Sequence, residues 1–290
     1  MVHNPKDLLF SCIGRRTVYR IGRTLYQHAR GDVANDMRSN GEMLIQRCVL
    51  GAWLKEGTPK NRLVVFDVGA NVGDWSAAFL RRVSDSSLRE FVDLYAFEPV
   101  PATAKTLRRN LGDQNPFLHY EQVALSSTNG DGNIYVGSGS GINSLHANPT
   151  RGDEEQIAVI KATAADFCRV HNIQRVQLIK CDTEGHDMEV IRGALPMMVD
   201  GSISILQFEY NYRWVFSRNY LRDAFIAIEN LPYKVAKLQS DHIFIFSEWH
   251  PELEKYFEGN YAIIHIDALG WFPSKRVNWD TYNTMHVEDQ

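Results

Sequence analysis

The stretch Leu63-Val-Val-Phe-Asp-Val-Gly-Ala-Asn-Val-Gly-Asp-Trp75 decides the fold of this 290-residue chain. Its first four residues form a short, β-branched-rich apolar run, which predicts a strand buried on both faces. Asp67 closes this strand, Gly69 and Gly73 bracket a tight turn, and a helical pattern starts at Trp75. A strand, a glycine-containing turn and a helix start together form a place where a ligand can approach bare backbone.

The same turn lacks the glycines that bind a dinucleotide. Aligned on Gly69, the fingerprint G-x-G-x-x-G requires glycine at positions 71 and 74, which hold Asn71 and Asp74. The second glycine lets a pyrophosphate come close, and an acidic side chain near a helix N-terminus repels phosphate. The turn therefore favours a ligand with a cationic or zwitterionic end. The alternative is a plain turn between strand and helix that binds no ligand.

Composition narrows the class of protein further. The net charge of −4, from 31 basic and 35 acidic residues, gives no electrostatic case for nucleic-acid binding. Four scattered cysteines without a C-x-x-C pair argue against a zinc ribbon or disulfide framework, and they favour a reducing, cytoplasmic location. No apolar run approaches the roughly 18 to 20 residues of a membrane span. We therefore expect an α/β enzyme of the cytoplasm.

We divide the chain into an N-terminal helical cap (1–60), an α/β domain (61–250) and an irregular tail packed on that domain (251–290). Residues 41–56 carry apolar side chains at helical spacing. An earlier helical stretch contains Arg15, Arg16, Arg20 and Arg23 between apolar residues. We interpret this stretch as a cap helix with a solvated basic face. Arginine-rich amphipathic segments also occur as transit peptides and membrane-surface helices.

The α/β domain is predicted to contain seven strands, mostly parallel with a late antiparallel hairpin. They lie at 63–67, 91–97, 117–124, 176–181, 202–208, 233–238 and 242–246. A further antiparallel pair, 132–136 and 157–162, interrupts the alternation of strands and helices. The Gly/Ser-rich loop between them, at 137–144, is either a flexible linker or a lid near a site.

Acidic residues follow four of the predicted strands: Asp67, Glu98, Asp182 and Glu209. In an open parallel sheet, ligands bind outside the carboxyl ends of the strands, so these carboxylates are expected to converge on one crevice. Glu98 stands about where an acidic residue holds ribose hydroxyls in nucleotide sites. Helix capping alone would account for Asp67 and Asp182.

These motifs resemble those of the FkbM-type methyltransferases, which are S-adenosylmethionine-dependent O-methyltransferases with a seven-stranded, Rossmann-like class I fold. The resemblance covers about residues 63 to 210. The segments that carry it are Asp67-Val-Gly-Ala-Asn-Val-Gly73, Phe97-Glu-Pro-Val-Pro101, Val123-Ala-Leu-Ser126, Lys180-Cys-Asp-Thr-Glu-Gly-His186 and Arg192-Gly-Ala194. It implies the fold and the cofactor, S-adenosylmethionine. Acceptors in the family are typically hydroxyls of sugars, polyketides and other secondary metabolites.

The resemblance also implies where the cofactor binds. The turn from Gly69 to Gly73 takes the amino-acid end, Asp67 holds its ammonium directly or through water, and Glu98 accepts the ribose hydroxyls. Residues around Gln122 border the adenine, and Ser144 is a cofactor or lid contact. The full predicted cofactor set is Asp67, Gly69, Ala70, Asn71, Gly73, Glu98, Pro99, Gln122, Val123, Ala124, Ser144 and Asp182.

A hydroxyl is a poor nucleophile, so methyl transfer to it calls for a general base. The candidates are Asp182, Glu184, His186 and Glu209. His186 titrates in a suitable range, but at a helix start a solvent-facing histidine is equally expected. A divalent Mg²⁺ or Ca²⁺ ion on Asp182, Glu184 and Glu209 is a less favoured alternative.

The predicted partner is a small hydroxylated acceptor, and the oligomeric state is left open, homo-oligomers included. Two other functions compete with O-methylation. One is a cofactor-binding scaffold without catalysis. The other is an N-methyltransferase, although Cys181-Asp-Thr-Glu stands where amino-group enzymes carry an Asp/Asn-Pro-Pro-Tyr/Phe signature.

Overall fold

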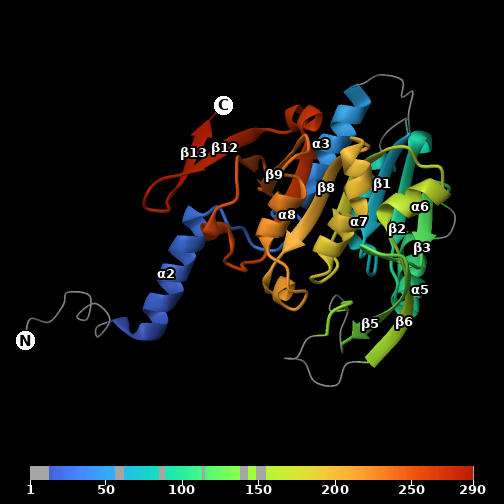
Figure 1. The fold of residues 1–290 in the computed structure, drawn as a ribbon, viewed down its shortest axis with the longest axis horizontal. Coiled ribbons are helices and arrows are strands. Elements are labelled where there is room, and N and C mark those ends of the chain that lie inside the picture. Colours follow the sequence, from blue (N-terminus) through green and yellow to red (C-terminus); the bar gives the residue numbers. More distant parts are fainter. Residues whose placement is uncertain are drawn as a thin grey trace, which may run out of the picture.

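A computed structural model describes residues 13–55, 62–84, 89–112, 115–137, 143–147 and 155–289 (Figure 1). Within these residues, a ten-stranded sheet forms the centre of the fold. Its strands are β1 (Leu63–Val68), β2 (Val92–Phe97), β3 (Leu118–Glu121), β7 (Val176–Cys181), β8 (Ile203–Tyr210), β9 (Tyr233–Leu238), β10 (Ile243–Phe246), β11 (Gly259–His265), β12 (Ser274–Trp279) and β13 (Met285–Asp289).

The strand order is β13-β12-β10-β9-β11-β8-β7-β1-β2-β3. The five strands from β8 to β3 are parallel, and β9 and β10 form the predicted antiparallel hairpin. The predicted count of seven strands is wrong because the tail, expected to be irregular, supplies β11, β12 and β13. Strand β11 inserts antiparallel between β8 and β9, where Tyr261, Ile263 and Ile264 are buried. The result is a mixed sheet in an α/β fold, as predicted.

Helices cover both faces of this sheet. One face carries α3 (Glu42–Lys55), α4 (Asp74–Ser84) and α5 (Pro101–Leu111), and the other carries α6 (Ala164–Val170), α7 (Asp187–Val199) and α8 (Leu221–Ala227). Four short 3₁₀ helices, η1 (Arg89–Phe91), η2 (Tyr212–Val215), η3 (Pro251–Leu253) and η4 (Ile266–Trp271), lie in connections. Every residue of β1 is buried, as its apolar run predicts, because its alternate side chains enter the two opposite cores.

The described helices before β1 differ in how they pack. Helix α3 is part of the core, with Leu44, Ile45 and Val49 buried against the sheet. Helix α2 (Arg15–Ala29) has no buried residue and projects from the body of the molecule (Figure 1). The exposure of α2 does not confirm its interpretation as a cap, which stays a prediction. Among the described helices, none combines the length and apolarity needed to cross a membrane.

A three-stranded sheet, in the order β4-β6-β5, lies next to the carboxyl end of β3. It consists of β4 (Ala124–Leu125), β5 (Gly130–Val136) and β6 (Glu155–Ala162). The antiparallel pairing of β5 with β6 is confirmed, whereas the strand predicted at 117–124 divides into β3 and β4 of two different sheets. Residues 138–142 lie outside the described part of the chain, and with them most of the loop predicted to be a linker or lid.

Candidate active site

The turn after β1 joins the carboxyl ends of three strands. Gly69 has φ = 77°, and its N–H donates to the carbonyl oxygen of Phe97 at the end of β2. A Cβ atom at this position would lie 2.0 Å from the carbonyl oxygen of Asp182, at the end of β7. A side chain is excluded both by the positive φ and by this close approach. Glycine here therefore allows the ends of β1, β2 and β7 to meet.

A first cavity opens beside this turn and encloses about 660 Å³ including its mouth. One wall is apolar and comes from β2 and from the small sheet and its neighbouring segments, with Phe97, Val123, Leu125, Ile134 and Leu145. Glu98 and Asp182 supply carboxylates from the ends of β2 and β7. The first cavity thus combines an apolar wall with a few fixed polar groups, which is the usual composition of a ligand pocket.

Glu98 is held in the first cavity by backbone groups. Its two carboxylate oxygens accept hydrogen bonds from the N–H groups of Asn71 and Val100, each at 3.0 Å. Burial raises the pKa of Glu98 to about 7, although the two backbone donors act in the opposite direction. The carboxylate is thus fixed in orientation and titrates near neutrality.

A second, more polar cavity lies on the other side of the turn. It is bordered by Glu42 of α3, Asp74 of α4, and Lys180 and Asp182 at the end of β7. Burial raises the pKa of Glu42 to about 7, while nearby Lys180 lowers it. Three carboxylates facing one ammonium group make this cavity favourable for a cation. Among the described carboxylates, Asp182 alone borders both cavities.

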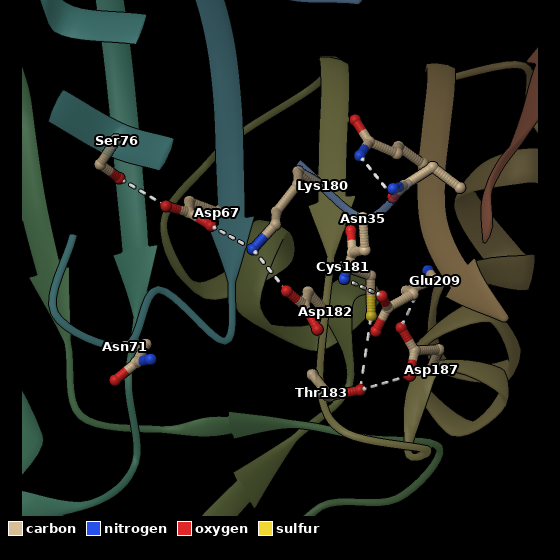
Figure 2. Close-up of polar contacts among 12 residues, drawn as sticks. Asn35, Asp67, Asn71, Ser76, Lys180, Cys181, Asp182, Thr183, Asp187 and Glu209 are labelled. Atoms are coloured by element: carbon tan, nitrogen blue, oxygen red, sulfur yellow. Dashed lines mark hydrogen bonds and ion pairs between the residues drawn. The ribbon is translucent and has the colours of Figure 1, made fainter. Parts of the chain in front are cut away.

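A buried ion-pair chain supports the wall between the cavities (Figure 2). The Nζ atom of Lys180 lies 3.2 Å from Asp67 Oδ1 and 3.6 Å from Asp182 Oδ2, and Ser76 Oγ donates to Asp67 Oδ2 at 2.6 Å. Burial disfavours the charged form of Lys180, but the carboxylates of Asp67, Asp182 and Glu42 together raise its pKa. Lys180 therefore stays protonated and fixes Asp182.

Asp67 is positioned differently from the prediction. It is fully buried, borders neither cavity, and has both oxygens engaged by Ser76 and Lys180. This placement gives no support to the predicted contact with a ligand ammonium group. Asp67 instead holds Lys180 under the turn.

Two predicted catalytic residues are tied to other side chains. Glu184 borders the first cavity, but its Oε2 lies 2.7 Å from Arg213 Nε. His186 is buried outside both cavities, with its ring nitrogens 2.9 Å from His146 Nε2 and 3.0 Å from Ser126 Oγ. Burial lowers the pKa of His186 to about 3. The expectations of a solvent-facing ring and of titration near neutrality are both wrong for His186.

Glu209, the fourth predicted catalytic residue, is also buried and borders neither cavity. Its carboxylate accepts a hydrogen bond from Asn35 Nδ2 at 3.0 Å (Figure 2). It also accepts one from Asn211 Nδ2 at 2.9 Å. Burial, reinforced by Asp182, raises its pKa well above the usual range. The structure does not bring Asp182, Glu184 and Glu209 together as metal ligands. Among the residues it describes, no three His, Cys, Asp or Glu side chains are grouped so that they could hold a metal ion.

The other predicted cofactor residues divide into two groups. Those that border a cavity are Gly69, Ala70, Asn71, Pro99, Val123 and Ala124. Those that do not are Gly73, Gln122 and Ser144. Gln122 is exposed, and Ser144 Oγ instead donates to the carbonyl oxygen of Glu184 at 2.9 Å, between cavity residues Asn143 and Leu145.

Sequence reasoning missed four polar residues of the second cavity: Asn35, Asn40, Glu42 and Lys180. Lys180 did carry a signal, because a charged residue inside an otherwise apolar buried strand requires a partner. The other three come from α3 and the segment before it, whose position against the β1 turn depends on tertiary packing. No local pattern marks them.

Comparison with known proteins places this site in a family. The family model described as the methyltransferase FkbM domain matches residues 67–256. The 2-O-methyltransferase NoeI of Sinorhizobium fredii (strain NBRC 101917 / NGR234) is 28% identical over 144 residues, covering 45% of this chain and 56% of that protein. Methyltransferase 1 of Beauveria bassiana (strain ARSEF 2860) is 28% identical over 148 residues, covering 44% and 57%. The chain thus matches a little over half the length of these curated relatives.

Solved methyltransferase structures are more distant. The DszA carbon methyltransferase has a TM-score of 0.42 at 10% identity, covering 78% of this chain and 53% of that one. A TehB-like methyltransferase from Corynebacterium glutamicum ATCC 13032 Kitasato has a TM-score of 0.34 at 10% identity, covering 85% and 94%. Similarity of this degree carries no argument about the reaction. The family match, by contrast, spans 190 of the 290 residues and includes the β1 turn, Glu98 and Asp182. The chain belongs to the FkbM methyltransferase family.

Proposed function

We propose that this methyltransferase transfers a methyl group from S-adenosylmethionine to a hydroxyl of a small, polar acceptor, such as a sugar or another secondary metabolite. The observation that carries the proposal is the position of Asp182, the described carboxylate that borders both cavities. A base at this junction can reach a hydroxyl that approaches a methyl group bound between the cavities. The relative NoeI is named as a 2-O-methyltransferase, which supports transfer to oxygen.

The residues present fit the cofactor that the family implies. In the first cavity, the apolar wall around Phe97 and Ile134 suits adenine, and Glu98 is positioned to accept the ribose hydroxyls. In the second cavity, Glu42 and Asp74 favour a cationic group and disfavour phosphate. S-adenosylmethionine has an adenosine, an ammonium group and no phosphate. When bound, it supplies a methyl group already activated by its sulfonium.

Glu42 takes the role in our proposal that the sequence suggested for Asp67. Its side chain borders the second cavity, whereas Asp67 is sealed beneath the turn. Burial removes the water that would stabilise the charged form of Glu42, and this raises its pKa to about 7. A cationic ligand restores that stabilisation, so Glu42 gains most from such a partner. Glu42 therefore holds the ammonium of the cofactor.

Asp182 is the general base in this mechanism. The Lys180 ammonium, anchored by Asp67, fixes one side of the Asp182 carboxylate and leaves the side chain 39% exposed toward the cavities. With the cofactor bound, Asp182 would accept the proton of the acceptor hydroxyl while the methyl group passes from the sulfonium to the acceptor oxygen, which would leave a neutral thioether. Since the methyl is already activated, alignment and exclusion of water supply much of the acceleration.

The test separates these two carboxylates. Asp182→Asn is expected to lower kcat on a hydroxylated acceptor by roughly 10²- to 10⁴-fold, the usual contribution of a general base. Glu42→Gln is expected to raise the Kd for S-adenosylhomocysteine by roughly tenfold, about 1.5 kcal/mol for a hydrogen bond to a charged group. Methyl transfer to a panel of sugars and phenols, with calorimetry of the cofactor product, measures both effects.

Asp200→Asn serves as the matched control, because Asp200 is exposed at the end of α7 and outside both cavities. An Asp182→Asn variant with a normal kcat would show that Asp182 is not the general base. Cofactor binding without methyl transfer to any hydroxylated acceptor would favour the scaffold function, and transfer only to amines would favour N-methylation.

A further inference from the structure

Helix α2 carries an apolar stripe that the other described residues leave largely uncovered, with Val18 half-buried. Val18, Ile21 and Leu25 follow one another at spacings of three and four residues, so they share one face of the helix. Ile21 is 52% exposed and Leu25 is 65% exposed. Large apolar side chains at these exposures, aligned on one helix, form a contact surface rather than isolated surface residues.

The contacts of α2 with the body come from a different face. Tyr26 donates a hydrogen bond to Glu252 and its ring meets the edge of Phe257. The guanidinium groups of Arg23 and Arg30 also lie over the Phe257 ring. Residues 23, 26 and 30 each stand five positions after a residue of the apolar stripe. At about 100° per residue, five positions correspond to about 140° around the helix, so the two sets lie on different faces. The apolar stripe therefore points away from the body.

The remaining surface of α2 is strongly cationic. The helix contains four arginines and no acidic residue in its fifteen positions. Arg16, Arg20 and Arg23 share the face opposite the apolar stripe, and Arg15 lies at its flank; all four are exposed. An apolar face combined with an arginine-rich polar face is the pattern of helices that lie in the interface of an anionic membrane. Long arginine side chains can extend from such a helix to the headgroups.

We propose that α2 binds the surface of an anionic lipid membrane, with Val18, Ile21 and Leu25 in the acyl boundary and Arg15, Arg16 and Arg20 at the headgroup phosphates. The contact between Tyr26 and η3 then holds the body on the aqueous side of the helix. A nucleic acid would pair with the arginines but leave the apolar stripe exposed. A second α2 would cover the stripe but leave the arginines on the opposite faces without an anionic partner. An anionic lipid surface matches both faces.

Vesicle flotation of the full chain tests this proposal. We expect binding to vesicles of equal parts phosphatidylcholine and phosphatidylserine, and little binding to phosphatidylcholine alone. Arg16→Gln with Arg20→Gln should weaken the partition coefficient roughly 25-fold, about fivefold for each charge. Leu25→Gln should weaken it roughly tenfold through lost apolar burial. All three side chains are exposed, so these variants should fold and keep wild-type affinity for S-adenosylhomocysteine.

Matched controls are Arg81→Gln with Arg109→Gln, and Ile226→Gln, which change equally exposed residues elsewhere. They should bind vesicles like the wild type. Binding that is independent of phosphatidylserine, or that survives the α2 variants, would overturn the proposal. So would a wild-type chain that ignores vesicles but forms an α2-dependent dimer in light scattering or binds a DNA duplex through α2. Normal vesicle binding by a chain without methyltransferase activity would refute the proposed function and leave this one standing.

Discussion

Replacing Glu98 by glutamine tests how burial, charge and cofactor binding are linked in the first cavity. The carboxylate accepts one backbone N–H on each oxygen, from Asn71 and from Val100. Glutamine keeps the shape but removes the charge and one of the two acceptor oxygens. One of these N–H groups must then face the side-chain NH₂.

The effect on stability depends on pH in a defined direction. Burial raises the pKa of Glu98 from 4.5 to about 7 in the folded protein. The contribution of this group to stability is therefore complete below about pH 4.5 and is lost as the pH rises through about 7. The loss approaches about 3 kcal/mol, at about 1.4 kcal/mol for each unit of pKa. The variant lacks this titration, but its mismatched N–H costs about 1 to 3 kcal/mol at every pH.

We therefore expect Glu98→Gln to be less stable than the wild type near pH 5, with the difference closing or reversing near pH 8. The effect of the substitution on cofactor binding should have the opposite pH dependence. Hydrogen bonds to a charged group contribute about 1.5 to 3 kcal/mol, so losing the charge should raise the Kd for S-adenosylhomocysteine roughly 10- to 100-fold. The wild-type Kd should also rise as the pH falls below about 7, because Glu98 and Glu42 are then protonated. In the variant, cofactor binding should be linked to one titrating group fewer, so the Kd should depend less steeply on pH.

Urea unfolding at the two pH values and calorimetry across the same range measure these effects, with Glu90→Gln as an exposed control. Two results would refute the reasoning. One is a stability difference that is the same at both pH values. The other is a Glu98→Gln variant that binds the cofactor product as tightly as the wild type.

Three further predictions concern the support of the site. Gly69→Ala should abolish cofactor binding or folding, since its Cβ would lie 2.0 Å from the Asp182 carbonyl oxygen. The control Gly51→Ala, whose Cβ would lie in open space, should do neither. Thermal melts with and without cofactor distinguish loss of binding from loss of folding. Lys180→Met should cost about 3 to 5 kcal/mol in urea unfolding by leaving buried Asp67 unpaired, and adding Asp67→Asn should recover part of it; a second change that recovers nothing would contradict the pairing. The ring signals of His186 should not titrate between about pH 5 and 8 in NMR spectra, because burial lowers its pKa to about 3; a midpoint near 6.5 would show that the ring reaches solvent.

Local pattern predicted the strands and the turn that border the two cavities. The apolar run before Asp67, the two glycines after it and the acid at the end of the next strand each depend on a few consecutive residues. Strand pairing then follows from burial on both faces, and parallel strands place their carboxyl ends at one edge of the sheet. This is why Glu98 and Asp182 were found without the structure.

The tail was misjudged for the opposite reason. Strand β11 is stable because it fills the position between β8 and β9, so its pairing partners lie about 25 to 60 residues away in sequence. Its stretch Tyr261–Ile264 is short, and periodicity alone does not separate such a run from other buried segments. Strand β11 is specified only by its pairing with β8 and β9 in the folded sheet.

What the sequence alone determined is which residue types stand at the strand ends: a turn without phosphate-binding glycines after β1, and carboxylates at Glu98 and Asp182. Tertiary structure alone decided which acids reach the cavities. It buried Asp67 beneath Lys180, enclosed Glu209 and His186, and brought Glu42 from a distant helix to the β1 turn. The physical reason is that residue type and spacing set what a group can do, whereas exposure and pKa depend on neighbours that only long-range packing supplies.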